Sequence, residues 1–560
     1  MGKLLIRNRK IMEKNKIDRR NFIKLGSLGA TVVITWPLLN SCNGFASENK
    51  NTINPDFQAD LDFELTAKET DIQLFQGNTT KVWMFEGNVL DGDKTTVQKL
   101  GKSYLGPIIR VRKGQKIRVR FKNQLPEESI VHWHGMHVPE EDDGHPKDVI
   151  ANGETYVYEF EIMNRAGTYW FHPHPHGRTG PQVYNGLAGL FVVTDDEEQR
   201  LKLPSGEYDV PVVLQDRQFD NNNQLVYLNR GRMDRMNGFL GNRILINGNP
   251  DMKLSLKSGC AYRLRFLNGS NSRFYKLAWE DGTPLVIIGK DGSLLDSPKS
   301  KPYVMLGVAE RIDVWLDLKN RPQGSQMIMK SLSFSPGMMG MMGGMIGRGR
   351  NNLPLGSTYE ILKINIDKTG SNDFELPQRL AEFNKLDPAT AVNRNNPRTF
   401  RFFMRRMQWT INGRTWEMTG VTEEETVKLN TTEVWEIVNR GGRMMGNDDM
   451  MGERGWMRNR GEMDRDRGMM GGGMQMPHPF HIHHLQFNIL ERDVSGVDSR
   501  IWNSVKDGFI DEGWQDTVLL MPGMSVKLIM RFEDFKGLFL YHCHNLEHED
   551  MGMMRNFKIE

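Results

Sequence analysis

The chain has 560 residues, which is too many for one compact core, so we expect several domains. Its composition, with 38% hydrophobic and 26% charged residues, is that of soluble globular domains. A net charge of +3 over this length gives no support for a nucleic-acid partner. The three cysteines, Cys42, Cys260 and Cys543, lie too far apart in the sequence to indicate a disulfide framework.

Residues 1–46 form a predicted export leader, which is a targeting segment and not part of the folded domains. Residues 18–24, DRRNFIK, resemble a twin-arginine export signal. The apolar stretch that follows contains Gly and Pro and is short for a membrane span, which argues against an ordinary anchor. The sequence LNSC, ending at Cys42, resembles a bacterial lipobox with Cys42 as the lipidated residue, and plain cleavage after Ala46 is the alternative. We expect an exported, periplasmic protein, either tethered to a membrane through Cys42 or free.

Most of the remaining chain alternates polar and apolar residues, which is typical of half-buried strands. A similar alternating phrase occurs three times, as GQKIRVRFKN at 114–123, GCAYRLRFLN at 259–268 and TTEVWEIVNR at 431–440. Asn-Gly and Asp-Gly turns between such runs favour antiparallel sandwiches. The sequence thus predicts an all-β fold of three related domains, at 55–200, 201–375 and 385–560.

Methionine is unusually frequent, with 35 residues, and many of them lie in two glycine-rich segments. The first segment, 335–352, interrupts the second predicted domain, and the other, 443–476, interrupts the third. Neither has a period that could bury a core, so we expect both to be mobile loops.

The 14 histidines supply the strongest functional signal. Most of them lie in four short segments, HWHGMH, FHPHPHG, HPFHIHH and HCHNLEH, each of which contains a His-x-His pair. In a strand, residues two apart point to the same face at a spacing of about 6–7 Å, so a pair can present two imidazoles to one metal or to adjacent metals. A single pair would be a weak signal, but four pairs are not explained by ordinary core or surface histidines.

Cys543 lies between the two histidines of the last pair. If this segment is a strand, the thiol faces away from both imidazoles and binds a different metal, while one covalent path joins the two sites. His548 and Met553 follow closely, and His478 can come from the preceding segment. Two imidazoles, one thiolate and a distant Met are the ligand set of a blue-copper centre, and the four pairs supply eight imidazoles for a second, multicopper site. Zinc is the rival metal, but a zinc site would gain nothing from a Met ligand or from this duplication.

These four segments resemble those of the multicopper oxidases, and the resemblance extends over essentially the whole chain after the leader. Within that family the chain is most similar to the bacterial periplasmic copper efflux (cuprous) oxidases. The resemblance implies three cupredoxin-like Greek-key domains, each a β-sandwich or barrel, with a trinuclear copper cluster between the first and the third. It also implies one-electron oxidation of a reductant at a type 1 copper and four-electron reduction of O2 to water at the cluster.

The resemblance further assigns residues to each of four copper ions. The type 1 copper would be held by His478, Cys543, His548 and Met553. The type 2 copper would be held by His132 and His481. The two type 3 coppers would be held by His134, His172, His174, His483, His542 and His544.

Two carboxylates match positions of acidic residues in the family. Asp143 falls where the family has an acid near the type 2 copper, and Glu549 matches a carboxylate that passes protons to the cluster. O2 reduction consumes protons, and a carboxylate near the cluster can relay them. An exposed acid in a turn is the alternative for both. The remaining histidines, which we expect outside the metal ligands, are His137, His145, His176 and His484, the last of which stands where the family usually has Gly.

The reductant is not identified by these motifs, but the methionines bear on it. Thioethers favour Cu(I) over hard cations, and the second Met-rich segment ends at Met474 and Met476, just before His478. Met476 matches a Met of the substrate-copper site in cuprous oxidases, whereas those relatives carry Asp at the position of Met474. A flexible loop that absorbs oxidants is the alternative for the segment.

We therefore expect a monomeric oxidase of Cu(I) that serves copper tolerance, with O2 as the acceptor. A laccase-like oxidase of small phenols or bilirubin-type pigments is the second candidate. A non-enzymatic copper-binding or envelope scaffold protein is the third, and the intact copper ligands argue against it.

Overall fold

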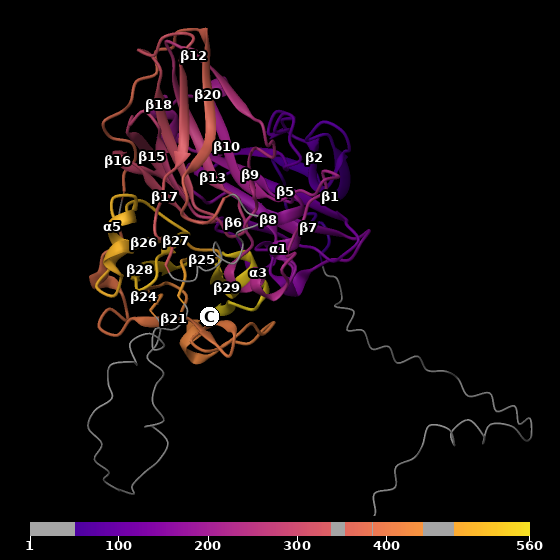
Figure 1. Cartoon of the computed structure of the whole chain (residues 1–560). Coiled ribbons are helices and arrows are strands. Elements are labelled where there is room, and N and C mark those ends of the chain that lie inside the picture. The colour runs from indigo at the N-terminus through magenta and orange to yellow at the C-terminus, as the bar shows by residue number, and fades with distance from the viewer. Residues whose placement is uncertain (1–50, 338–352, 384, 441–474) are drawn as a thin grey trace, which may run out of the picture. The chain divides into compact units, whose positions relative to one another are not determined.

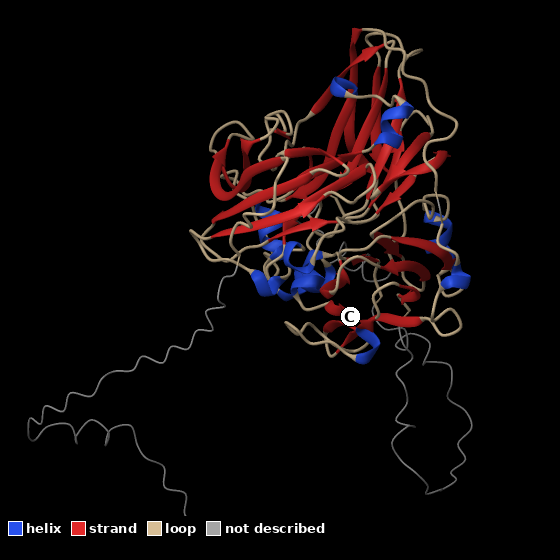
Figure 2. Cartoon of the chain, turned by 180° about the vertical axis from the view of Figure 1, so that it is seen from behind, coloured by secondary structure: helices blue, strands red, loops and turns tan. Residues whose placement is uncertain are grey.

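Strands make up nearly all the regular structure of the described chain, and its helices are few and short (Figure 2). The computed structural model describes residues 51–337, 353–383, 385–440 and 475–560. The predicted leader with Cys42, as well as Met474 and most of both Met-rich segments, lie outside these residues. Among the described residues, no helix is both long and apolar enough to span a bilayer.

The first pair of sheets, with strand orders β2-β1-β5-β7 and β3-β4-β9-β8-β6, is built by the N-terminal part of the described chain (Figure 1). Its strands are β1 (Leu61–Ile72), β2 (Thr80–Asp91), β3 (Val97–Gln98), β4 (Ile108–Arg112), β5 (Lys116–Gln124), β6 (Val131–His134), β7 (Thr155–Glu161), β8 (Gly167–Pro173) and β9 (Gly189–Thr194). Apolar side chains from both sheets, including Phe63, Trp133 and Phe171, form one buried core.

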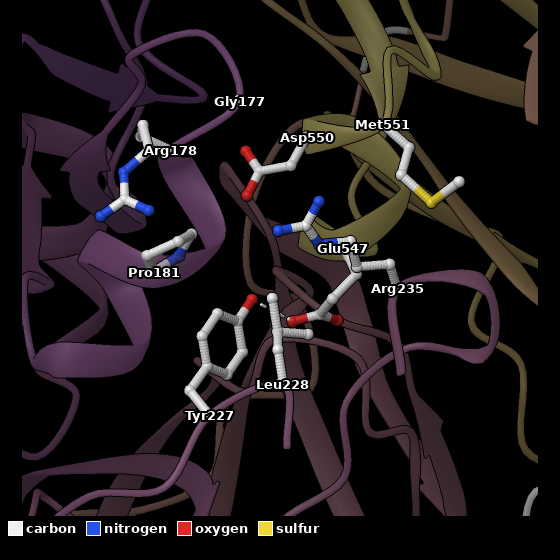
Figure 3. Close-up of a pocket in the computed structure, with 9 residues that line it drawn as sticks. All are labelled: Gly177, Arg178, Pro181, Tyr227, Leu228, Arg235, Glu547, Asp550 and Met551. Carbon is white, nitrogen blue, oxygen red and sulfur yellow. Dashed lines mark hydrogen bonds between the residues drawn. The ribbon is translucent and has the colours of Figure 1, made fainter. Parts of the chain in front are cut away.

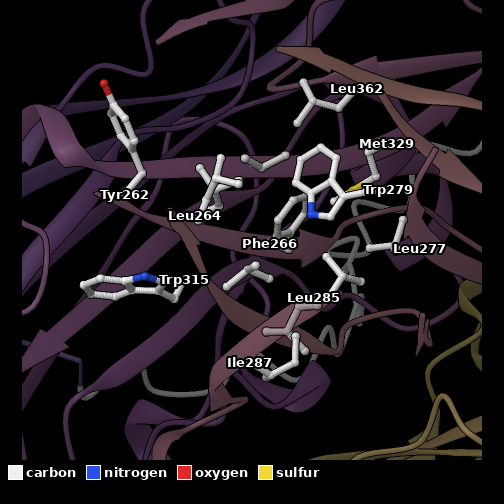
Figure 4. Close-up of a cluster of buried hydrophobic side chains, with 14 of the residues drawn as sticks. Tyr262, Leu264, Phe266, Leu277, Trp279, Leu285, Ile287, Trp315, Met329 and Leu362 are labelled. Carbon is white, nitrogen blue, oxygen red and sulfur yellow. The ribbon is translucent and has the colours of Figure 1, made fainter. Parts of the chain in front are cut away.

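The second pair of sheets has strand orders β11-β10-β13-β18-β15-β16 and β12-β20-β19-β14-β17. Its strands are β10 (Asp209–Arg217), β11 (Arg243–Ile246), β12 (Lys253–Ser258), β13 (Ala261–Asn268), β14 (Tyr275–Trp279), β15 (Leu285–Lys290), β16 (Ser293–Lys301), β17 (Val304–Leu306), β18 (Arg311–Asp317), β19 (Gln326–Ser331) and β20 (Tyr359–Thr369). Figure 4 shows its core, in which Phe266 and Leu264 of one sheet meet Trp279 and Met329 of the other.

The third pair of sheets has strand orders β22-β21-β24-β28-β26 and β23-β30-β29-β25-β27. Its strands are β21 (Arg398–Arg405), β22 (Gln408–Ile411), β23 (Thr426–Val427), β24 (Thr431–Val438), β25 (His478–Ile482), β26 (Phe487–Asp493), β27 (Thr517–Leu520), β28 (Ser525–Phe532), β29 (Gly537–Cys543) and β30 (Met554–Ile559). Its core contains Trp435 and Phe480, and it also contains Cys543 and Met553.

Short helices connect these strands. The α-helices are α1 (Thr179–Asn185), α2 (Asp196–Leu201), α3 (Arg232–Asn237), α5 (Ser499–Val505) and α6 (Leu546–Asp550), and the 3-10 helices are η1 (Glu140–Asp142), η2 (Pro146–Asp148), η3 (Gly206–Tyr208), η4 (Pro388–Thr390) and η5 (Glu423–Glu425).

The three recurring phrases occupy equivalent positions in the three pairs of sheets. They form β5, β13 and β24, and each of these pairs in parallel with the first strand of its own unit, which is β1, β10 or β21. That first strand in turn pairs antiparallel with the strand that follows it. The burial of β5 alternates residue by residue, as its polar and apolar pattern predicts.

The predicted all-β fold of three cupredoxin-like domains is therefore confirmed. We refer to the three pairs of sheets as domains 1, 2 and 3. The boundaries at 55–200, 201–375 and 385–560 stay a proposal, which is supported by the observation that no sheet formed by the described residues crosses them.

Candidate metal centre

The predicted type 1 residues come together at one end of the β25–β29 pair in domain 3. Cys543 Sγ lies 3.3 Å from Nδ1 of His478 and 3.7 Å from Nδ1 of His548. Cys543 ends β29, His478 begins β25, and His548 is in α6. Met553 is fully buried in the same core, and its carbonyl accepts a hydrogen bond from the Cys543 N–H. The three nitrogen and sulfur atoms thus converge on one point.

The electrostatics of this group suit a metal ion. Burial raises the pKa of the Cys543 thiol above its usual value, and it lowers the pKa of His548 to about 3. The imidazoles are therefore neutral and have lone pairs to offer, whereas the thiolate form needs a compensating cation. A metal ion supplies that charge, because binding and deprotonation are coupled.

The eight histidines of the His-x-His pairs form a second group, contributed by domains 1 and 3. In domain 1, β6 pairs with β8 so that His132 lies opposite His172. In domain 3, β25 pairs with β29 so that His481 lies opposite His542. All eight side chains are fully buried. His132 and His134 both lie in β6, so they point to the same side, whereas His174, His483 and His544 directly follow the ends of β8, β25 and β29.

Within this group, nitrogen–nitrogen distances define one pair and one triad of histidines, and ring-centroid distances define a second triad. Nε2 of His132 and Nε2 of His481 are 3.4 Å apart. In the first triad, Nε2 of His542 lies 3.4 Å from Nε2 of His174 and 3.2 Å from Nε2 of His483. In the second triad, the ring centroids are separated by 5.7 Å for His134 and His172, 5.0 Å for His134 and His544, and 5.2 Å for His172 and His544.

Several of these nitrogens have no hydrogen-bond partner among the described residues. They are His134 Nδ1, His172 Nε2, His174 Nδ1 and both ring nitrogens of His544. Buried polar atoms are almost always paired, and burial together with the neighbouring imidazoles keeps these rings neutral by lowering their pKa values. Converging neutral imidazoles with free lone pairs are suited to copper ions.

Asp143 orients two of the histidines. Its carbonyl accepts a hydrogen bond of 2.7 Å from Nδ1 of His132, and its carboxylate Oδ2 accepts one of 2.8 Å from Nδ1 of His483. Each bond places the proton on Nδ1 and leaves Nε2 free, which is the usual arrangement behind metal-binding imidazoles. Asp143 is fully buried, so it is not the exposed turn acid of the alternative interpretation.

Glu549 lies beside the first triad. Its carboxylate oxygens are 3.5 Å from His174 Nε2 and 3.3 Å from His542 Nδ1. Burial, together with the neighbouring acids Asp550 and Glu547, raises the pKa of Glu549 well above its usual value. Glu549 is also buried rather than an exposed turn acid.

A pocket of about 270 Å³ is lined by residues of α6, α1, α3 and the segment before α3 (Figure 3). Glu547 and Asp550 line it, and Tyr227 Oη donates a hydrogen bond of 2.6 Å to Glu547. The exposed side chains of Arg178 and Arg235 also line it. The helix α6 therefore carries acidic side chains both at the first triad, through Glu549, and at this pocket, through Glu547 and Asp550.

The sequence patterns did not reveal Asp516. This fully buried residue precedes β27, and its Oδ1 lies 3.0 Å from Nε2 of His134 while its carbonyl accepts a hydrogen bond of 2.8 Å from Nδ1 of His481. No spacing relative to the histidines points to it, because it is 32 residues after His484 and 26 residues before His542.

The four remaining histidines make other contacts. His137 lies between the His484 carbonyl, 2.9 Å away, and Asp534 Oδ2, 2.8 Å away. His145 Nε2 lies 3.0 Å from Asn556 Oδ1, and His176 packs against Trp416. His484 has a φ of +66°, the left-handed conformation that the family's Gly would adopt without strain, and its ring stacks on Phe539.

The comparisons with known proteins agree with this arrangement. Family models described as multicopper oxidase match residues 76–198 and 390–560. The crystal structure of a variant of the multicopper oxidase McoA from Aquifex aeolicus is 31% identical, covers 90% of this chain and 97% of its own, and superimposes with a TM-score of 0.71.

Two further relatives differ in how they are described. A multicopper oxidase from Campylobacter jejuni, called a metallo-oxidase, is 27% identical over 89% of this chain and 90% of its own, with a TM-score of 0.66. A laccase from Bacillus subtilis is 27% identical over 89% of this chain and 94% of its own length. Since these matches include both histidine-bearing domains, the chain belongs to the multicopper oxidases, copper-dependent oxidoreductases that bind one type 1, one type 2 and two type 3 coppers and use O2 as the acceptor.

Proposed function

We propose that the protein is a cuprous oxidase, which oxidises Cu(I) at the type 1 copper and thereby serves copper tolerance. The type 1 ligands in this proposal are His478, Cys543, His548 and Met553. The type 2 ligands are His132 and His481. The type 3 ligands are His134, His172, His174, His483, His542 and His544. The close nitrogens of His132 and His481, the nitrogen triad of His174, His483 and His542, and the neighbouring rings of the second triad support this assignment.

When bound, the coppers supply one-electron transfer at the type 1 position and four-electron reduction of O2 to water at the cluster. The chain joins the two positions directly, because Cys543 is flanked by His542 and His544. Asp143 holds His132 and His483 with their Nε2 atoms free. In the proposal, Glu549 carries a proton on its carboxylate beside His174 and His542.

The choice of Cu(I) rests on the way domain 2 covers the type 1 residues. His548 Nε2 donates a hydrogen bond of 3.1 Å to the carbonyl of Met236 in α3, and Trp409 Nε1 donates one of 2.9 Å to the same carbonyl. The indole of Trp409 packs against both type 1 imidazoles, with ring centroids 4.7 Å from His478 and 4.9 Å from His548. Among the described residues, neither type 1 imidazole therefore has an edge exposed to a bulky organic donor.

Two exposed methionines lie on the segments that provide this cover, and their thioethers suit a soft ion. Met233 of α3 and Met407 are exposed at 41% and 42%, and Arg232 Nη2 donates a hydrogen bond to the Met407 carbonyl, which brings the two segments together. The second Met-rich segment enters domain 3 at Met476. Thioethers bind Cu(I) well and offer nothing specific to a phenol.

Met474 and Met476 are the proposed ligands of the substrate copper. Met474 lies outside the described residues. Met476 is 1% exposed in the domain 3 core, which also contains Cys543 and Met553. Its place in this core favours delivery of an electron close to the type 1 residues.

A laccase-like oxidase of small phenols or bilirubin-type pigments is the second candidate. It is favoured by the similarity to the laccase of Bacillus subtilis, whereas the similarity to the metallo-oxidase of Campylobacter jejuni favours a metal substrate.

Shortening 443–473, with Met474 to His478 retained, distinguishes the two candidates. We expect kcat/KM for Cu(I) to fall while that for a small phenol persists or rises, because only the copper substrate uses the thioethers. Met476→Leu, which nearly conserves volume, should likewise reduce Cu(I) turnover more than phenol turnover. Met530→Leu, at another fully buried methionine of the same core, is the matched control. Unchanged Cu(I) kinetics in the shortened enzyme would favour the laccase-like function.

We also propose export by the twin-arginine route to the periplasm as a monomer, with Cys42 as a lipid anchor. Support comes from DRRNFIK at 18–24 and LNSC at 39–42. Cys42→Ser should move the protein from the membrane to the soluble fraction on cell fractionation. An unchanged distribution would favour plain cleavage of the leader.

A further inference from the structure

Domain 2 contains no histidine, since the chain has none between His176 and His478. One of its side chains nevertheless bonds to Asp516, the acid that contacts His134 of the eight-imidazole group. Arg311, the first residue of β18, is fully buried. Its Nη1 donates a hydrogen bond of 2.6 Å to Asp516 Oδ1, and its Nη2 donates one of 2.5 Å to Asp516 Oδ2. This bidentate pairing fixes the plane of the carboxylate as well as its position.

Asp516 passes this orientation on to the histidines. Its Oδ1 accepts a hydrogen bond of 3.0 Å from Nε2 of His134, and this bond places the proton on Nε2 and leaves the lone pair on Nδ1. Nδ1 of His134 is one of the buried nitrogens without a partner among the described residues. The Asp516 carbonyl also accepts a hydrogen bond of 2.8 Å from Nδ1 of His481, which frees Nε2 of that ring.

Arg311 also contacts the domain 1 strand that carries His172. Its Nε donates a hydrogen bond of 2.8 Å to the carbonyl of Thr168 in β8. Gly135, directly after His134, lies against the same ion pair: a Cβ at this position would be 2.3 Å from Asp516 Oδ2 and 3.1 Å from Arg311 Nη2. Gly135 also has a φ of +82°, so a residue with a side chain would be strained there. The three domains therefore meet at this guanidinium.

We propose that Arg311 is a positioning residue of the trinuclear copper cluster. Through Asp516 it holds His134 and His481 in the tautomers and orientations that copper requires, so domain 2 controls cluster assembly without contributing a ligand. The inference rests on the proposed assignment of these two histidines to the cluster. It does not depend on whether Cu(I) or a phenol is the substrate.

The test compares copper binding by Arg311→Lys and Arg263→Lys. Lysine keeps the charge of Arg311 but loses the two parallel bonds to Asp516. Arg263 is the matched control, since it is also a buried domain 2 arginine paired with two carboxylates, Asp313 and Glu198. Copper content is titrated against a competing chelator. The near-ultraviolet band of the type 3 pair and the visible band of the type 1 copper are recorded in parallel, with the thermal midpoint of each copper-free protein.

Arg311→Lys should bind the cluster coppers about 10- to 100-fold more weakly and lose the near-ultraviolet band, while the visible type 1 band stays unchanged. Arg263→Lys should retain all four coppers even where its thermal midpoint falls. Wild-type copper affinity in Arg311→Lys would overturn the proposal, and so would an equal loss of cluster copper in both variants.

Asp516→Asn keeps the test decisive if Arg311→Lys does not fold. The amide retains the shape of the side chain but no longer offers two acceptor oxygens to Arg311. We expect the same selective loss of cluster copper, and normal cluster copper in this variant would also overturn the proposal. The ratio of Cu(I) to phenol turnover does not enter any of these readouts, so failure here is distinguishable from failure of the proposed substrate.

Discussion

Cys543 is the residue at which the two groups of side chains meet. Its sulfur faces His478, whereas the neighbouring His542 faces His174 and His483. Adjacent side chains of a strand point to opposite faces, so one short stretch of backbone serves both sites. Burial raises the pKa of the thiol, so Cys543 keeps its proton until a metal ion compensates the charge of the thiolate.

Cys543→Ser should abolish the intense visible absorption of the thiolate–copper bond, stop turnover and remove about one copper ion per protein. The trinuclear cluster should remain, because its proposed ligands are all histidines and do not include Cys543. Absorption spectroscopy and metal analysis check both outcomes. Cys260→Ser, at the other fully buried free thiol of the described chain, should leave the colour unchanged. An active and equally coloured Cys543→Ser protein would contradict the assignment.

At the scale of a single element, α6 contacts more than one part of the site. Asn545 caps the helix by accepting a hydrogen bond from the His548 N–H. Successive residues of a helix point about 100° apart, so the five residues of α6 contact several different parts of the molecule. His548 faces Cys543, Glu549 faces the first triad, and Asp550 accepts hydrogen bonds from the first N–H groups of α1. One short helix thereby joins the type 1 group, the cluster and domain 1.

Glu549→Gln should slow O2 consumption by about 10²- to 10⁴-fold, because an amide cannot transfer a proton from this position. Copper content should stay unchanged, since Glu549 is not a proposed ligand. Glu547→Gln is the matched control on the same helix, because Glu547 is equally buried and bonds instead to Tyr227 and to the Phe239 N–H. Equal oxygen uptake by the two variants would show that Glu549 does not relay protons.

At the scale of the whole molecule, stability and copper binding depend on the same buried groups. Burial lowers the pKa values of nine of the ten histidines proposed as ligands. The raised pKa values of the buried acids Glu549 and Asp550 act in the opposite direction, but the histidines outnumber them. In the copper-free protein, many imidazoles are therefore neutral in the folded state and bind a proton more readily when the chain unfolds.

The copper-free protein should lose stability as the pH falls below the ordinary histidine pKa of 6.5 toward about 3, the folded-state pKa of His542 and His548. Below pH 6.5 the unfolded chain binds more protons than the folded one, so each such histidine lowers the free energy of unfolding by up to about 1.4 kcal/mol per pH unit. Urea unfolding of chelator-treated protein between pH 7 and pH 4 measures this slope. Copper should raise the midpoint at neutral pH, because it binds the folded state. A flat profile would contradict this account.

The sequence by itself was sufficient for the all-β fold and for the histidines and the cysteine that converge. These features are local: alternation over a few residues makes β5, β13 and β24, and the His-x-His pairs and Cys543 lie in short segments at or next to strands. Only the tertiary structure decided how the six imidazoles assigned to the type 3 coppers group, with His542 next to His174 and His483. It also decided that Asp516 and Arg311 stand behind His134, and that the Met236 carbonyl covers His548. The contacting residues are 205 positions apart for Arg311 and Asp516, 382 for His134 and Asp516, and 312 for Met236 and His548. Such contacts depend on how separately folded sheets pack against one another, which no local periodicity encodes.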